Sequence, residues 1–182
     1  MHRIRSFIFL YFIFTLSACS YFSLSADYAS PKTDQINEPI DNTYALRLPN
    51  NISTSEKVII VDPKTHVFGA YGADGKLIRA GLASAGANWC EDIKRPCRTK
   101  EGSYRVYFLG SVDCVSSLYP IPHGGAPMPY CMFFNGYQAL HGSPHVTEGN
   151  ISHGCVRLRE EDAEWLRFNF VEVGTKIIIM PY

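Results

Sequence analysis

The chain has 182 residues, and its 17 basic and 17 acidic side chains give a formal net charge of zero. Hydrophobic residues make up 46% and charged residues 19% of the sequence, which excludes a wholly disordered chain. The zero net charge gives no electrostatic case for nucleic-acid binding, and the length fits one domain with a buried core.

The first 18 residues have the pattern of a secretory signal peptide. Arg3 and Arg5 form a short basic region, and residues 7–18 continue as an apolar run that ends in small side chains. A helix that spans a bilayer takes about 20 residues, so this run is too short to be a transmembrane segment. We therefore expect residues 1–18 to be removed.

The end of this signal reads LSAC at positions 16–19, which resembles the bacterial lipobox. The resemblance implies that Cys19 is lipidated and becomes the first residue of the mature chain. Ser20 in place of Asp implies, by the same resemblance, a periplasmic protein anchored to the outer membrane. The alternative is an ordinary signal cleaved near Ala18, with Cys19 as an incidental thiol.

A polar segment separates this region from the expected domain. Residues 20–57 are rich in Ser, Asn, Asp and Pro and show no sustained period of 2 or 3.6. We expect residues 19–56 to form a flexible tether and residues 57–182 to form the folded domain. The alternative is that part of the tether, around residues 44–48, packs on the domain as an additional strand.

The folded domain is predicted to be mainly β. A hairpin turn is expected at residues 73–75, a loop over the Pro-rich residues 120–129, and a single late helix from the acidic residues 160–162 onward. Many short strands with one late helix predict a β-sandwich or barrel. The strands are expected at residues 57–61, 67–71, 77–85, 102–109, 132–134, 138–140 and 176–180.

The residues best suited to chemistry lie between positions 141 and 157, in the sequence HGSPHVTEGNISHGCVR. A thiolate is a strong nucleophile, and an imidazole such as that of His141 or His153 can take the proton of the Cys155 thiol. Gly154 permits a tight turn that can direct backbone N–H groups at a developing oxyanion. The pattern predicts a Cys–His site for acyl transfer.

Residues 152–157, SHGCVR, preceded by HGS at 141–143, resemble the signature of the L,D-transpeptidase (YkuD) family. The resemblance extends over about residues 57–180, and the run-up MPY at 128–130 also matches. It implies a YkuD-like β-sandwich of mixed sheets with one or two short helices. The small secreted form resembles the "enhanced entry" branch of that family.

The sequence departs from the family pattern in three places. Residues 99–102 read TKEG where the family usually has Thr-Pro-x-Gly. Residues 88–98 form an insertion with two cysteines, and the Pro-rich loop 120–129 is a second elaboration. These departures bear on substrate preference more than on the type of reaction.

The resemblance assigns catalytic roles residue by residue. Cys155 would be the nucleophile and His141 the general base, with the carbonyl of Gly142 orienting the imidazole. Backbone N–H groups around His153, Gly154 and Cys155 would form the oxyanion hole, and His153 would support the turn.

The resemblance also assigns the substrate side. Arg157 would hold a carboxylate or peptide group of the donor, and Tyr130 would line the donor pocket. Ser152, placed with these residues, would mainly support the turn. No cofactor or metal is implied.

The implied reaction is peptidoglycan acyl transfer. The nucleophile would attack the third residue of a stem tetrapeptide, release D-alanine, and pass the acyl group to an amine. The alternatives are an L,D-carboxypeptidase, an amidase that detaches protein from peptidoglycan, and a non-catalytic wall-binding lipoprotein. The expected partners are stem peptides, and the membrane through the lipid anchor only. We expect a monomer that binds no nucleic acid.

Two other site classes fit the residues poorly. His141, His145 and Cys155 could ligate zinc, but Pro144 interrupts a shared helical face and no carboxylate completes a known zinc spacing. Papain-like enzymes place the cysteine well before the histidine, whereas His141 precedes Cys155.

The six cysteines suit an oxidising compartment. With one assigned to lipid and one to catalysis, four remain, which allow three connectivities. We favour Cys90–Cys97 and Cys114–Cys131, because each pair closes a short loop. The alternative is that one or both pairs stay reduced.

Overall fold

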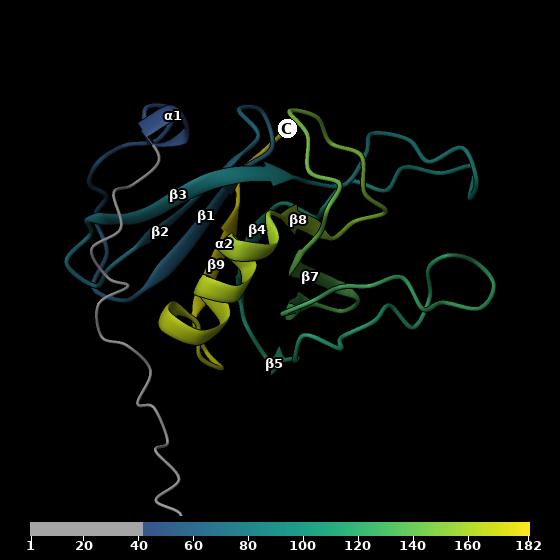
Figure 1. Cartoon of the computed structure of the whole chain (residues 1–182). Coiled ribbons are helices and arrows are strands. Elements are labelled where there is room, and N and C mark those ends of the chain that lie inside the picture. Colours follow the sequence, from purple (N-terminus) through teal and green to yellow (C-terminus); the bar gives the residue numbers. More distant parts are fainter. Residues whose placement is uncertain (1–41) are drawn as a thin grey trace, which may run out of the picture. The chain divides into compact units, whose positions relative to one another are not determined.

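One mixed β-sheet organises residues 42–182, the part of the chain that the computed structural model describes (Figure 1). Its strand order is β4-β9-β1-β2-β3-β8-β7-β6-β5, with β1–β9 and β7–β8 as parallel pairs. The expected mainly β fold with mixed pairing is confirmed. The strands are β1 Val58–Asp62, β2 Val67–Tyr71, β3 Leu77–Ser84, β4 Gly102–Arg105, β5 Phe108–Leu109, β6 Met132–Asn135, β7 Gln138–Gly142, β8 Val156–Leu158 and β9 Lys176–Ile179.

The single strand expected over residues 102–109 is instead two strands, and the break between them curls the sheet. β4 pairs with β9 at one end of the strand order, and β5 pairs with β6 at the other. Between them, the Val106 N–H donates to the Thr175 carbonyl and the Tyr107 N–H to the Phe133 carbonyl, each at 2.9 Å. One short stretch of chain thus joins both ends of the sheet.

The curled sheet encloses a core together with the late helix. α2, Glu160–Trp165, is continued by a π-helical turn over Leu166–Phe170, and both contribute buried side chains. Asp162 is buried in α2 and accepts a hydrogen bond from Arg79 at 2.8 Å. Core residues come from both halves of the sheet, including Ile59, Phe68, Met132, Leu140, Leu158 and Ile177.

Residues 42–56, which the sequence analysis placed in the tether, pack against the sheet in the structure. They begin with the short helix α1, Asn42–Ala45, rather than the alternative extra strand. Tyr44 and Ala45 are buried against β2 and β3. The Ile52 N–H then donates to the carbonyl of Gly75, at 2.9 Å. A few side chains of this segment, such as Tyr44 and Ile52, pack against the sheet. They are too few to give the sequence a sustained helical or strand period.

This segment also reaches the region between the two expected catalytic residues. The guanidinium of Arg47 lies 2.6 Å from the carboxylate of Glu148 and donates to the Thr65 carbonyl at 3.1 Å. Glu148 belongs to the loop that connects β7 to β8.

The expected signal peptide, Cys19 and most of the expected tether lie outside the described residues. Within residues 42–182, no helix is long and apolar enough to cross a membrane.

Candidate active site

β7 and β8 bring the two ends of the HGS…SHGCVR sequence together. They are parallel neighbours in the register Leu140↔Val156 and His141↔Arg157. Cys155 immediately precedes β8, so it lies two residues before Arg157. Side chains alternate between the faces of a strand, so Cys155 and Arg157 share the face of His141. β8 was not among the expected strands, although it is the element that places the thiol.

The Cys155 thiol lies against β7. Its sulfur is 3.5 Å from the Tyr137 carbonyl and accepts a hydrogen bond from the backbone of Ala139. The residue is partly exposed and packs against Met128 and Cys131. Burial of the sulfur raises the pKa of the thiol above its usual range, which outweighs the lowering by the Ala139 contact. The side chain of Cys155 therefore rests as a thiol near neutral pH.

His141 is buried and its imidazole is neutral. Its Nδ1 lies 2.8 Å from the Gly142 carbonyl, so Nδ1–H is the donor and Nε2 remains to accept a proton. Burial, aided by the positive charge of Arg157, lowers the pKa of His141 to about 4. The imidazole is thus unprotonated near neutral pH. The carbonyl of Gly142 makes the contact expected of it.

These two pKa shifts predict how the thiol reacts with pH. Iodoacetamide should alkylate Cys155 slowly near neutral pH, because the raised pKa of the thiol keeps the thiolate scarce. The rate should increase with pH through the alkaline range, since a neutral His141 cannot hold a thiolate as an ion pair. Mass spectrometry of timed samples measures this rate. A plateau that begins in the acidic range would contradict the prediction.

The turn before Cys155 is held by Ser152 and Gly154. Ser152 is buried, and its hydroxyl accepts from the Gly154 N–H at 3.0 Å and donates to the Cys155 carbonyl. Gly154 has φ of 126°, a conformation that side-chain-bearing residues rarely adopt. Because the Gly154 N–H is used within the turn, the N–H groups of His153 and Cys155 are the ones left for the expected oxyanion hole.

Thr99, which was not among the expected site residues, fixes the direction of the Cys155 N–H. Its buried hydroxyl donates to the Gly154 carbonyl at 2.9 Å and accepts from the Gly86 N–H at 2.9 Å. A peptide unit is planar, so holding the Gly154 carbonyl also orients the Cys155 N–H. The signal was present, because Thr99 is the Thr retained where the family pattern loses its Pro.

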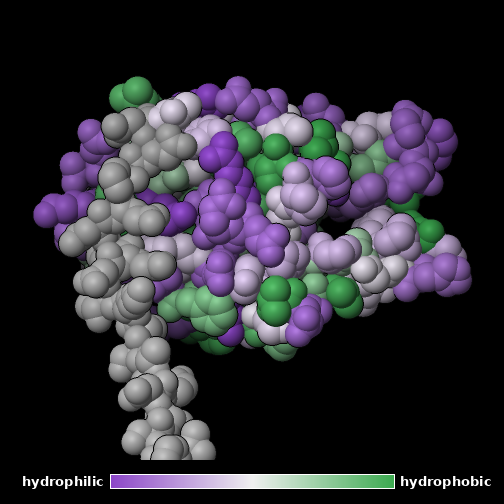
Figure 2. All heavy atoms as spheres, viewed as in Figure 1, coloured by the Kyte–Doolittle hydropathy of each residue, from purple (hydrophilic) through white to green (hydrophobic). Residues whose placement is uncertain are grey.

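His153 is held from two sides. Its Nε2 donates to the carboxylate of Asp92, with distances of 2.7 and 2.9 Å to the two oxygens. Its ring packs on Tyr119, with 4.3 Å between the ring centroids. Asp92 lies in the insertion 88–98 and Tyr119 in the loop between β5 and β6. These two loops project on one side of Figure 1, and Figure 2 shows a hollow between the projecting parts.

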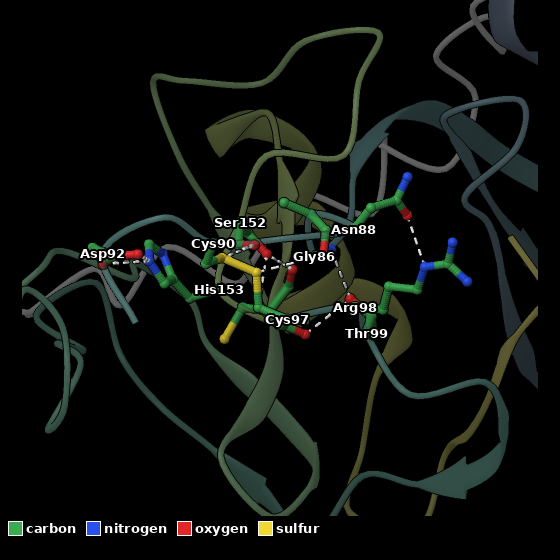
Figure 3. The surroundings of a disulfide bond; sticks show 12 residues. Gly86, Asn88, Cys90, Asp92, Cys97, Arg98, Thr99, Ser152 and His153 are labelled. Carbon is green, nitrogen blue, oxygen red and sulfur yellow. Dashed lines mark hydrogen bonds and ion pairs between the residues drawn. A yellow bond between two sulfur atoms is a disulfide. The ribbon is translucent and has the colours of Figure 1, made fainter. Parts of the chain in front are cut away.

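The structure has disulfides Cys90–Cys97 and Cys114–Cys131, the two pairs favoured from the sequence. We call residues 90–97 the disulfide loop. Cys90, Asp92 and His153 place potential metal-ligand atoms within 4.8 Å of one another. However, Cys90 is bonded to Cys97 and has no thiolate to offer, so the cluster is a loop contact (Figure 3).

This pairing has a direct chemical test. Peptide mapping without reduction is expected to recover the Cys90 peptide linked to that of Cys97, and the Cys114 peptide linked to that of Cys131. Cys155 should be recovered as an alkylated thiol, since it is the free cysteine of the described residues. Recovery of Cys155 in a native disulfide would contradict the pairing.

The two expected substrate residues differ in their surroundings. Arg157 is half-buried beside the thiol, and within residues 42–182 no acidic side chain is found paired with it. Tyr130 instead turns toward the late helices, where its hydroxyl donates to Glu164 at 3.1 Å and its ring contacts Phe168. A role for Tyr130 in a donor pocket stays a prediction.

Comparison with known proteins agrees with this geometry. Residues 56–179 match the model of the YkuD family, described as the L,D-transpeptidase catalytic domain. No curated protein matched the chain.

Among solved structures, an L,D-transpeptidase from Xylanimonas cellulosilytica is 26% identical, with a TM-score of 0.62, over 75% of this chain and 67% of that one. An L,D-transpeptidase from Mycobacterium smegmatis is 24% identical, with a TM-score of 0.57, over 69% and 59%. L,D-transpeptidase 3 from Mycobacterium tuberculosis, in complex with a faropenem-derived adduct, is 22% identical, with a TM-score of 0.56, over 69% and 60%. This chain spans about 57% to 67% of the length of the first three structures that it matches. The chain belongs to the L,D-transpeptidase catalytic domain (YkuD) family.

Proposed function

We propose that this protein is a peptidoglycan L,D-transpeptidase in which Cys155 is the nucleophile. The observation that carries the proposal is the arrangement on β7 and β8. A neutral, buried His141, oriented by Gly142, shares one strand face with the thiol and with Arg157. This arrangement supplies a nucleophile, a proton acceptor and a cation for one substrate.

The first half-reaction forms a thioester. Nε2 of His141 takes the Cys155 proton as the sulfur attacks the carbonyl of the third stem-peptide residue. The negative charge on the carbonyl oxygen develops next to the Cys155 N–H, which Thr99 orients through the Gly154 carbonyl. The C–N bond then breaks, and His141 gives its proton to the leaving amine of D-alanine.

The second half-reaction returns the thiol. An amine attacks the thioester carbonyl, His141 takes a proton from that amine, and the sulfur leaves and recovers the proton. Water in place of the amine would make the enzyme a carboxypeptidase. Arg157, with no acidic partner among the described residues, is suited to a carboxylate or carbonyl of the donor.

Defined muropeptides test the reaction. The purified mature protein is incubated with a tetrapeptide-stem disaccharide, with and without a second stem as acceptor, and the products are identified by mass spectrometry. A cross-linked dimer with release of D-alanine supports the proposal. A trimmed tripeptide alone would indicate a carboxypeptidase, and absence of turnover would overturn catalysis.

We propose that the protein acts in the periplasm, anchored to the outer membrane through Cys19. The support is the lipobox-like sequence at 16–19 with Ser20 after it. Stable anchoring needs more than one acyl chain, which lipoprotein processing supplies at one cysteine. The lipoprotein branch of the family stays a prediction.

Replacement of the anchor residue tests this location. Cys19→Ser should release the protein from the outer-membrane fraction or leave the precursor uncleaved, whereas the unchanged protein should fractionate with that membrane. The N-terminal peptide should carry an acyl mass. Unchanged protein that is soluble and lacks this mass would show that positions 16–19 are an ordinary cleavage region.

A further inference from the structure

The segment that carries the disulfide loop also holds the residues just before the nucleophile. The Ser152 N–H donates to the Ala85 carbonyl at 3.1 Å, and the Ala87 N–H donates to the Ser152 carbonyl at 2.8 Å. Thr99, at the other end of the segment, donates a hydrogen bond to the carbonyl of Gly154, the residue after His153. Ser152 and Gly154, the two neighbours of His153, are therefore both hydrogen-bonded to this one segment.

The side chain of His153 is fastened to the same segment by Asp92. Figure 3 shows the Asp92 carboxylate pointing at the imidazole, and both carboxylate oxygens lie within 2.9 Å of Nε2. The hydrogen bond from His153 lowers the pKa of Asp92, so the carboxylate is ionised near neutral pH. A charged acceptor makes this a stronger contact than one between neutral groups.

The disulfide loop keeps the Asp92 carboxylate within hydrogen-bonding distance of His153. Asp92 lies between Cys90 and Cys97, whose disulfide closes the loop. The Cys90 N–H donates to the Arg95 carbonyl at 3.0 Å, which shapes the loop from within. A closed loop has fewer conformations than an open one, so the carboxylate loses little entropy when it meets His153.

Tyr119 packs on a face of the imidazole, whereas Asp92 bonds to its edge. The two rings are inclined at 34° with centroids 4.3 Å apart. Tyr119 belongs to the loop that is closed by Cys114–Cys131. Asp92 and Tyr119 therefore restrain the ring from two different loops.

We propose that Asp92 is a positioning residue that acts through His153 to hold the turn that presents Cys155. The inference rests on the proposed function, because it takes Cys155 as the nucleophile. The disulfide loop then stabilises the turn before Cys155. This role explains why an insertion absent from the family pattern lies next to that turn.

Loss of the Asp92 contact should change the rate of the chemical step and leave substrate binding unchanged. If the turn loosens, the Cys155 N–H and sulfur leave their reactive geometry, although the substrate-binding groups remain. The rate of the chemical step should fall while the concentration for half-saturation stays unchanged. A merely structural role would instead reduce the fraction of protein that reacts.

Acylation by faropenem measures both quantities on the full mature chain. The variants are Asp92→Ala and Asp92→Asn, with Glu91→Gln as the matched control. Glu91 lies next to Asp92 and pairs with the exposed Lys94 at 2.7 Å, so the control removes the same charge without touching His153. Mass spectrometry gives the acylated fraction at the end point, and stopped-flow absorbance gives the saturating rate and the half-saturating concentration.

For Asp92→Ala we expect a saturating rate lowered about tenfold or more, with complete acylation at the end point. Asp92→Asn keeps an acceptor for Nε2–H, so its rate should fall by about threefold or less. Glu91→Gln should react as the unchanged protein does. These results together support the proposal.

Three results would overturn it. An Asp92→Ala rate equal to that of the unchanged protein would leave Asp92 without a positioning role. Incomplete acylation with an unchanged rate in the reactive fraction would assign Asp92 to folding alone. If the unchanged protein formed no adduct on Cys155, the proposed function would fail, and this inference with it.

Discussion

Cys155→Ala is expected to abolish transpeptidation and covalent addition of a carbapenem or penem. In the proposed reaction the sulfur of Cys155 forms the thioester, and an alanine methyl has no atom that could replace it. The fold should persist, because the change removes one partly exposed atom beside Ala139 and leaves both disulfides in place. Muropeptide turnover, adduct mass and the midpoint of thermal unfolding are the measurements.

The matched control for the nucleophile is Cys155→Ser, which keeps the size of the side chain. It should keep the fold and lose nearly all turnover, because a hydroxyl is a far weaker nucleophile than a thiolate. An alanine variant that retained the turnover of the unchanged protein would show that Cys155 is not the nucleophile.

His141→Ala should lower turnover by about two orders of magnitude or more, as loss of a general base does. The remaining activity should increase with pH, because the thiol must then lose its proton to solvent and burial raises its pKa. The unchanged enzyme should keep its base down to acidic pH, since His141 has a pKa of about 4. The pH profiles of kcat for the two proteins test this difference.

His145→Ala is the matched control, since His145 is exposed in the loop between β7 and β8. It should leave turnover unchanged. His153→Ala should act through the turn, with a measurable loss of stability and a slower chemical step. If His141→Ala were harmless and His153→Ala abolished turnover, the roles of the two histidines would be reversed.

Local sequence patterns predicted most of the sheet. β2 was expected with its observed bounds, and β1, β3, β6, β7 and β9 differ from expectation by one or two residues at their ends. The errors have one physical cause, which is long-range pairing. Val156–Leu158 is too short to give a pattern and becomes a strand only because β3 and β7 pair with it.

Site residues that lie within one sequence motif could be predicted. Site residues that come from distant segments of the chain could not. Cys155 and His141 were identified from 17 consecutive residues, 141–157. Asp92 lies 61 positions from His153, and no spacing rule connects them. Thr99 lies 55 positions from Gly154, although its place in the altered TKEG sequence offered a signal.

A fragment of this protein must include the segment before β1 if it is to keep the contacts of the sheet. A fragment that begins at residue 56, where the family match begins, would uncover Val67, Tyr71 and Leu77 on the outer face of the sheet. Such an apolar strip promotes association between copies. The fragment would also lose Arg47, and with it the ion pair to Glu148 in the loop that joins β7 to β8. Weak activity in a fragment that begins at residue 56 would therefore be caused by the loss of this segment, and would not measure the activity of the whole protein.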